Sequence, residues 1–130
     1  MIEFGGDNLE FNKDAPVLIS CAKGEPTDEV WNVLNIVIQA SENERYEIQF
    51  DDYVMYTVRN ESYTAWDDYE IRKGNYLVKF DRSRLLDYYG EVIIHTADYS
   101  WPHVKKHYGV YTETHIIDVL ASQKSVIKKL

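Results

Sequence analysis

The sequence predicts an α+β fold that is mainly β: six or seven strands in a curved antiparallel sheet or open barrel, with one or two short helices. The first observation behind this prediction is the alternation of Tyr46, Ile48 and Phe50 with polar neighbours, which is typical of a half-buried antiparallel strand. The second is that the segments rich in strand-forming residues are mostly separated by short polar turns. Such turns leave no room for the helices that connect parallel strands.

The first half of the chain contains three predicted strand segments. Residues 16–22 form the first, which ends at the turn signal in residues 23–26. Residues 30–40 fit a helix by the spacing of their apolar side chains and a strand by their alternation and β-branched content; we favour the strand, and the helix stays open. Residues 46–58 predict one long strand that bends or bulges near residues 51–52.

The second half contains the helix signal and the remaining strands. Residues 76–80 predict a strand, and Asp81 is expected to cap a helix of at most two turns. Residues 91–96 predict another strand, and residues 107–120 predict one or two more. Residues 122–130 are expected to form a short helix or a frayed tail.

The length of the chain bounds its organisation. We expect residues 1–130 to form a single domain, because this is the common size of one domain and no linker-like segment divides it. The chain has neither a membrane-spanning apolar run nor a signal-peptide pattern, so we expect a cytoplasmic location and no membrane partner. Cys21 is the only cysteine, and an inert buried thiol is its expected role.

The charge of the chain limits its partners. With 22 Asp and Glu against 14 Lys and Arg, the formal net charge is −8, which disfavours nucleic acid. The same negative charge would attract a basic protein. Alternatively, it only keeps the protein soluble. Eleven tyrosines and three tryptophans add contact area of the kind found at protein interfaces, although half-buried strands also favour tyrosine.

No local motif indicates a catalytic or cofactor site. The sequence lacks a glycine-rich phosphate loop, a serine nucleophile elbow, a zinc-protease HExxH and a CxxC pair. We therefore expect no cofactor and favour a protein that is not an enzyme. A catalytic group assembled from distant segments stays open.

The four histidines lie in the last third of the chain. They are His95, His103, His107 and His115. In one continuous strand His107 and His115 would stand roughly 26 Å apart, too far to share a metal ion. We expect no metal site, unless the chain turns near residues 112–113.

A second group of residues follows the strand predicted at 46–58. Arg59 and Glu61 share one face if that strand continues, with aromatic residues close behind them. An arginine beside a carboxylate and aromatic rings can hold an anionic or planar ligand, or can form an ion pair that closes the edge of the sheet. The candidate binding residues are Arg59, Glu61, Tyr63, Trp66, His107 and Tyr111.

Four segments carry a resemblance to other proteins. Residues 58–63, 83–88, 107–111 and 115–119 resemble segments of small uncharacterised bacterial proteins, some of which are similar to the immunity partners of secreted toxins. The resemblance covers about the second half of the chain and implies no catalytic residues. It favours a binding protein.

Charge, tyrosine content and resemblance together predict a non-enzymatic bacterial binding protein. Its expected role is that of an immunity-type inhibitor, which covers a basic toxin-like protein with an acidic, tyrosine-rich face. The alternative is a small enzyme or small-ligand-binding domain with a pocket near Arg59, Glu61 and His107. A third possibility is an assembly subunit whose exposed strand pairs across a two-fold axis, so the oligomeric state is left open.

Overall fold

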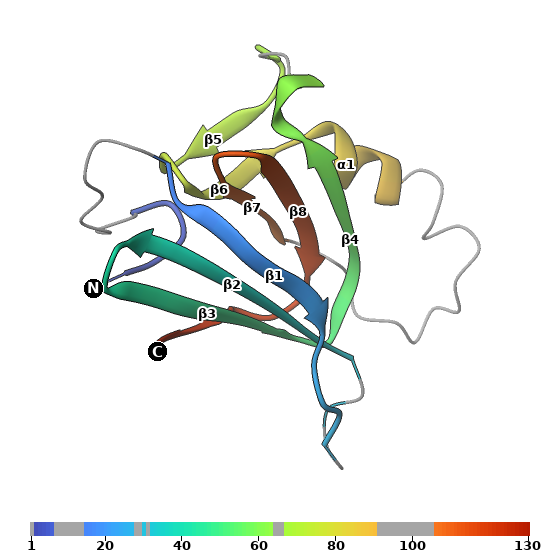
Figure 1. Ribbon diagram of the computed structural model, residues 1–130. Coiled ribbons are helices and arrows are strands. Elements are labelled where there is room, and N and C mark those ends of the chain that lie inside the picture. The colour runs from blue at the N-terminus through green and yellow to red at the C-terminus, as the bar shows by residue number, and fades with distance from the viewer. Residues whose placement is uncertain (1, 7–14, 28–29, 31, 64–66, 91–105) are drawn as a thin grey trace.

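The chain forms two antiparallel sheets that face each other across a shared core (Figure 1). The computed structural model describes residues 2–6, 15–27, 30, 32–63, 67–90 and 106–130. The four-stranded sheet contains, in spatial order, β1 (Val17–Lys23), β2 (Val33–Ser41), β3 (Glu44–Asp51) and β9 (Val126–Lys129). The five-stranded sheet contains β4 (Tyr53–Asn60), β8 (His115–Ala121), β7 (Lys106–Tyr111), β6 (Leu77–Arg82) and β5 (Ile71–Lys73).

The prediction of a mainly β, antiparallel fold is confirmed, and the predicted strand count is wrong. Nine strands lie within the described residues, rather than six or seven, and they form two sheets rather than one curved sheet or open barrel. Residues 16–22 and 76–80 correspond to β1 and β6. Residues 107–120 contain two strands, β7 and β8, joined by a tight turn.

Alternating side chains of β2 and β3 supply half of the core. Most of residues 30–40 lie in the strand β2, as we favoured, and its register with β3 places Ile36 opposite Ile48 and Leu34 opposite Phe50. Every second residue is buried from Leu34 to Ala40 in β2 and from Tyr46 to Phe50 in β3, which is the pattern that their alternation predicted. The buried residues that face them from the five-stranded sheet are Leu77, Tyr108, Val110, Ile117, Val119 and Ala121.

The predicted single strand at 46–58 is two strands in different sheets. β3 ends at Asp51, β4 begins at Tyr53, and Asp52 between them has a φ of 52°, in the left-handed region. Its backbone N–H donates a hydrogen bond to the carbonyl of Asn32 at 2.6 Å. The bend that we expected here is therefore the crossing from one sheet to the other.

The positive φ at Asp52 leads to a stability prediction. A Cβ in this conformation costs about 1 kcal/mol, and Asp tolerates it better than Ala because its short polar side chain bonds locally. We expect Asp52→Ala to lower the free energy of unfolding by about 1 kcal/mol, and Asp52→Gly to change it by less than about 0.5 kcal/mol. Urea unfolding measures both. Equal losses in the two variants would contradict this explanation.

Three other predictions differ from the structure or lie outside it. The helix α1 (Arg84–Tyr88) begins after Ser83 and not after Asp81, which belongs to β6. The segment 122–130 contains the strand β9, paired with β3, rather than a helix or a frayed tail. The strand predicted at 91–96 lies outside the described residues.

Figure 1 shows α1 beside β4, on the side of the five-stranded sheet that points away from the four-stranded sheet. A second, smaller cluster of buried side chains forms there, where Leu120 of β8 packs with Tyr89, Leu85 and Leu86. None of the helices in the described residues has the length and apolar character needed to cross a membrane. A pocket lies on the outer face of the five-stranded sheet, beside α1.

Candidate functional site

A pocket of about 400 Å³ lies between α1 and the outer face of the five-stranded sheet. Residues of β7 and β8 alternate between the core and this face, so His107 and Asp118 point away from the core that contains Tyr108 and Val119. The pocket has a mixed charge. The ionisable residues that line it are Arg59, Asp67, Glu70, Arg72, Arg84, His107 and Asp118.

His107 and Asp118, which line this pocket, belong to a chain of buried polar groups. Ser83, His107 and Asp118 are 0%, 2% and 6% exposed. The Nδ1 atom of His107 lies 2.7 Å from the Ser83 hydroxyl, and its Nε2 atom lies 2.7 Å from a carboxylate oxygen of Asp118. The ring of Phe80 stacks on the imidazole, with 3.8 Å between the ring centroids.

The two hydrogen bonds of the imidazole belong to a continuous path. With the ring proton on Nε2, this atom donates to Asp118 and Nδ1 accepts from the Ser83 hydroxyl. The Ser83 oxygen in turn accepts from the backbone N–H of Leu86 at 3.1 Å. Each polar atom of this buried path thus has a partner, as a buried polar group requires.

The same three residue types form the triad of serine hydrolases, but Ser83 is not placed as a nucleophile. A catalytic serine must reach a substrate carbonyl with its oxygen. The Ser83 oxygen is fully buried and acts as the N-cap of α1, where it accepts the Leu86 N–H bond. This arrangement fixes the start of α1 against the sheet.

Asp118 connects two of the predicted binding residues. Its second carboxylate oxygen lies 3.7 Å from a guanidinium nitrogen of Arg59 and accepts a hydrogen bond from Thr57 at 3.4 Å. Arg59 and His107 therefore meet at one carboxylate. Asp118 was not among the predicted binding residues, although a lone carboxylate between Ile117 and Val119 in an apolar strand is a signal of a buried polar site.

The other predicted binding residues lie elsewhere. The Tyr111 hydroxyl accepts a hydrogen bond from Arg72 at 3.0 Å, and burial raises the pKa of Tyr111. Glu61 is exposed in the short 3-10 helix η1 (Glu61–Tyr63) and does not line the pocket. The Tyr63 side chain and the whole of Trp66 lie outside the described residues.

The rim of the pocket carries an ordered group of side chains that we call the Tyr69 cluster. The guanidinium carbons of Arg82 and Arg84 lie over the Tyr69 ring, 4.6 Å and 4.2 Å from its centroid. Arg84 also forms an ion pair with Asp67 at 3.0 Å, and the Tyr69 hydroxyl donates a hydrogen bond to Asp87. The cluster comprises Asp67, Tyr69, Arg82, Arg84 and Asp87.

The contacts within the cluster shift the pKa values of three of its members. The hydrogen bond from Arg84 holds the pKa of Asp67 below its usual value, and the same bond raises the pKa of Arg84. The hydrogen bond to the Asp87 carboxylate raises the pKa of Tyr69, because it favours the protonated phenol. Three segments of the chain are thus linked at the surface by charged hydrogen bonds.

The lowered pKa of Asp67 provides a test of the ion pair between Asp67 and Arg84. In a pH titration followed by NMR, we expect the Asp67 carboxyl to titrate below the ordinary Asp range, and to return toward that range in Arg84→Gln. A lowered folded-state pKa means that the interaction stabilises the fold above the unfolded pKa and is lost as the pH falls through the folded pKa. Arg82→Gln is the control, because it leaves the Asp67–Arg84 pair intact. An unchanged Asp67 pKa in Arg84→Gln would contradict the ion pair.

The metal hypothesis receives no geometric support from the described residues. A turn does occur at residues 112–114, but His107 pairs with Leu120 at one end of the β7–β8 hairpin and His115 lies at the other end. No group of three or more His, Cys, Asp and Glu side chains in the described part of the chain is placed to hold a metal ion. His95 and His103 lie outside it.

Much of the negative charge also lies outside the described residues. Seven of the 22 acidic residues, but only two of the 14 basic residues, fall in the undescribed ranges. The described residues therefore hold 15 acidic and 12 basic side chains, a difference of −3 against −8 for the whole chain.

Comparison with known proteins identified no relative. No family model, no curated protein and no solved structure matches the chain.

Proposed function

We propose that this chain is a non-enzymatic binding domain of the immunity type, which holds a basic protein partner on the Tyr69 cluster and the neighbouring pocket. The observation that supports this most is the ordering of Tyr69, whose ring and hydroxyl are held by Arg82, Arg84 and Asp87 before any partner binds. Binding normally costs conformational entropy for each surface side chain that becomes fixed. A side chain that is already fixed reduces this cost.

The composition of this surface is that of a protein interface. Tyrosine and arginine are enriched among the residues that contribute most to binding energy. Tyr88 lies at the edge of the pocket with half of its surface exposed, and it adds a second aromatic ring beside the cluster. The adjacent pocket gives a partner side chain a place to insert.

The charges of the cluster favour a basic partner. Its arginines are engaged by groups of the same chain: Arg84 by Asp67, and Arg82 by the Tyr69 carbonyl at 2.6 Å. The carboxylates next to it include Asp68 and Glu70, so carboxylates outnumber guanidinium groups on this surface. The net charge of −8 would also speed the encounter with a basic protein.

Affinity capture tests this proposal. The tagged chain and a Tyr69→Ala/Tyr88→Ala variant are used as baits, with elution by increasing salt. We expect the wild type to retain a basic protein that salt releases, and the double variant to bind it at least 100-fold more weakly. The control is Tyr56→Ala, which removes an exposed tyrosine of β4 that does not line the pocket. If both variants bind a partner as the wild type does, or none is retained, the proposal is wrong.

A second candidate function is small-ligand binding in the same pocket. It is favoured by the meeting of Arg59 and His107 at Asp118, two of the three residues expected around such a pocket. Thermal unfolding in the presence of small carboxylates and phosphates distinguishes the two candidates. A ligand whose stabilising effect is lost in Arg59→Ala and kept in Tyr69→Ala would favour the small-ligand site.

A further inference from the structure

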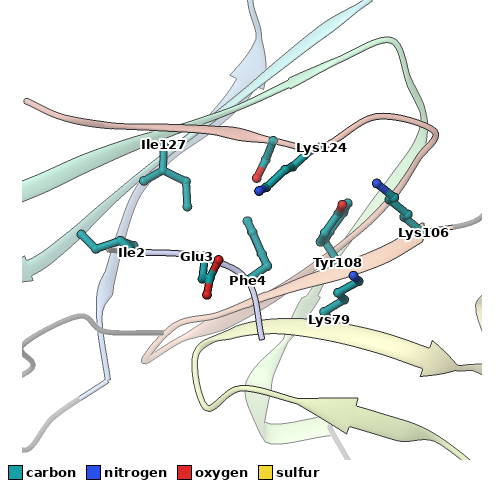
Figure 2. Close-up of a pocket in the computed structure, with 9 residues that line it drawn as sticks. Ile2, Glu3, Phe4, Lys79, Lys106, Tyr108, Lys124 and Ile127 are labelled. Carbon is teal, nitrogen blue, oxygen red and sulfur yellow. The ribbon is translucent and has the colours of Figure 1, made fainter. Parts of the chain in front are cut away.

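A second pocket, of about 420 Å³, lies beside the N-terminal residues 2–6, at the place where this segment runs between the two sheets (Figure 2). One side comes from Ile2, Glu3 and Phe4, and the other sides come from β6, β7 and the segment that enters β9. The backbone N–H of Gly5 donates to the Leu77 carbonyl at 2.8 Å, which attaches this N-terminal segment to β6.

The floor of this pocket is apolar. The ring of Phe4 packs against Tyr108 and Phe50, with centroid distances of 4.9 Å and 5.7 Å. Ile2 and Ile127 also line the pocket, and both pack against the shared core. Tyr108 is 3% exposed, and burial raises the pKa of its hydroxyl.

The rim of the pocket is basic. Among the described residues that line it, Lys79, Lys106 and Lys124 stand against the single carboxylate of Glu3. Figure 2 shows the amino groups of Lys79 and Lys106 near Tyr108. Within the described residues, none of these three lysines forms an ion pair. The pocket beside α1 differs, because Arg59 and Arg84 are paired with carboxylates there.

We propose that this pocket binds a small anion with an apolar body, of the class of medium-chain or aromatic carboxylates. The lysines would meet the anionic head, and Ile2, Phe4 and Ile127 would cover the apolar part. A pocket of this volume suits a small molecule, and sites of this kind combine an apolar lining with a few placed polar groups. Three cations around an apolar floor in an acidic chain favour such a ligand over a neutral one. The inference does not depend on the proposed protein-binding surface, which shares no residue with this pocket.

Calorimetric titration with octanoate tests the site. We expect saturable binding by the wild-type chain, and binding about tenfold weaker in Lys79→Gln/Lys106→Gln, because each partly exposed contact contributes a few-fold in affinity. The matched control is Lys128→Gln/Lys129→Gln, which makes the same change in net charge on β9 without touching the pocket. Octanamide, which has the same chain and no charge, is expected to bind more weakly than octanoate.

A second measurement locates the ligand and checks the fold of each variant. In NMR spectra we expect octanoate to shift the signals of Ile127 and Tyr108, and the variants to keep the dispersed spectrum of the wild type. The inference is overturned if octanoate does not bind the wild type, or if it shifts residues of the α1 pocket instead. It is also overturned if the two double variants lose affinity equally, since only general charge attraction would then be at work.

Discussion

Replacing Asp118 by alanine is expected to lower the free energy of unfolding by about 3 kcal/mol. The carboxylate is 6% exposed and accepts hydrogen bonds from His107 and Thr57. Without it, the Nε2–H of His107 stays in a buried position with no acceptor at the site of the missing oxygen. The cost of leaving a buried donor unpaired exceeds the modest net gain from an ordinary hydrogen bond.

A double-mutant cycle shows whether the loss comes from this interaction. Urea unfolding of Asp118→Ala, His107→Leu and the double variant gives the coupling energy. We expect the double variant to be more stable than the sum of the single losses predicts, by about 1 to 2 kcal/mol, because it leaves no unpaired partner. Additive losses would show that the two side chains act independently.

Two milder substitutions separate the contributions to this loss of stability. Asp118→Asn keeps an acceptor for His107, so we expect it to cost less than Asp118→Ala. Ser83→Ala removes the N-cap of α1 and the second partner of His107, and caps of this kind contribute about 1 kcal/mol. A loss in Asp118→Asn as large as in Asp118→Ala would point to charge, through Arg59, as the main factor.

The core strands were predictable because burial in a strand alternates residue by residue. Tyr46, Ile48 and Phe50 are all buried in β3, and the same alternation in β2 decides between strand and helix for residues 30–40. The division into two sheets was not predictable in this way. The alternation continues on both sides of Asp52, and its positive φ redirects the chain without an obvious signal in the pattern.

β9 illustrates a second limit. Its four residues, Val126–Lys129, have too little alternation and too many charges to indicate a strand by themselves. They form one because β3 offers an open edge, with Ile127 opposite Ile48. Pairing of this kind depends on the rest of the fold, and no local pattern encodes it.

Only the residues of the site that belong to a local sequence pattern were predictable. Arg59 was expected near a ligand because it ends a strand, but the parity argument that placed Glu61 on the same face fails, since β4 ends at Asn60 and a 3-10 helix begins. His107 and Asp118 meet because the register of the β7–β8 hairpin places these two residues, eleven apart in sequence, on one face. That register depends on a turn whose position the sequence left open.

Phe50→Ala is expected to have the largest effect on stability, a loss of about 4 kcal/mol in urea unfolding. Phe50 is 1% exposed, and its ring packs against Phe4 and Tyr108, so its removal leaves a cavity between the two sheets. Phe50→Leu fills most of that space and is expected to cost much less. A loss below about 1 kcal/mol in Phe50→Ala would mean that the sheets close over the gap.

The neighbouring Phe4 separates the core from the basic pocket. Phe4 is only partly buried, so Phe4→Ala is expected to cost about 1 kcal/mol, well below Phe50→Ala. Because Phe4 also lines the lysine pocket, we expect its replacement to weaken octanoate binding, while the three lysines stay in place. If Phe4→Ala destabilised the chain as much as Phe50→Ala, the N-terminal segment would be an integral part of the core.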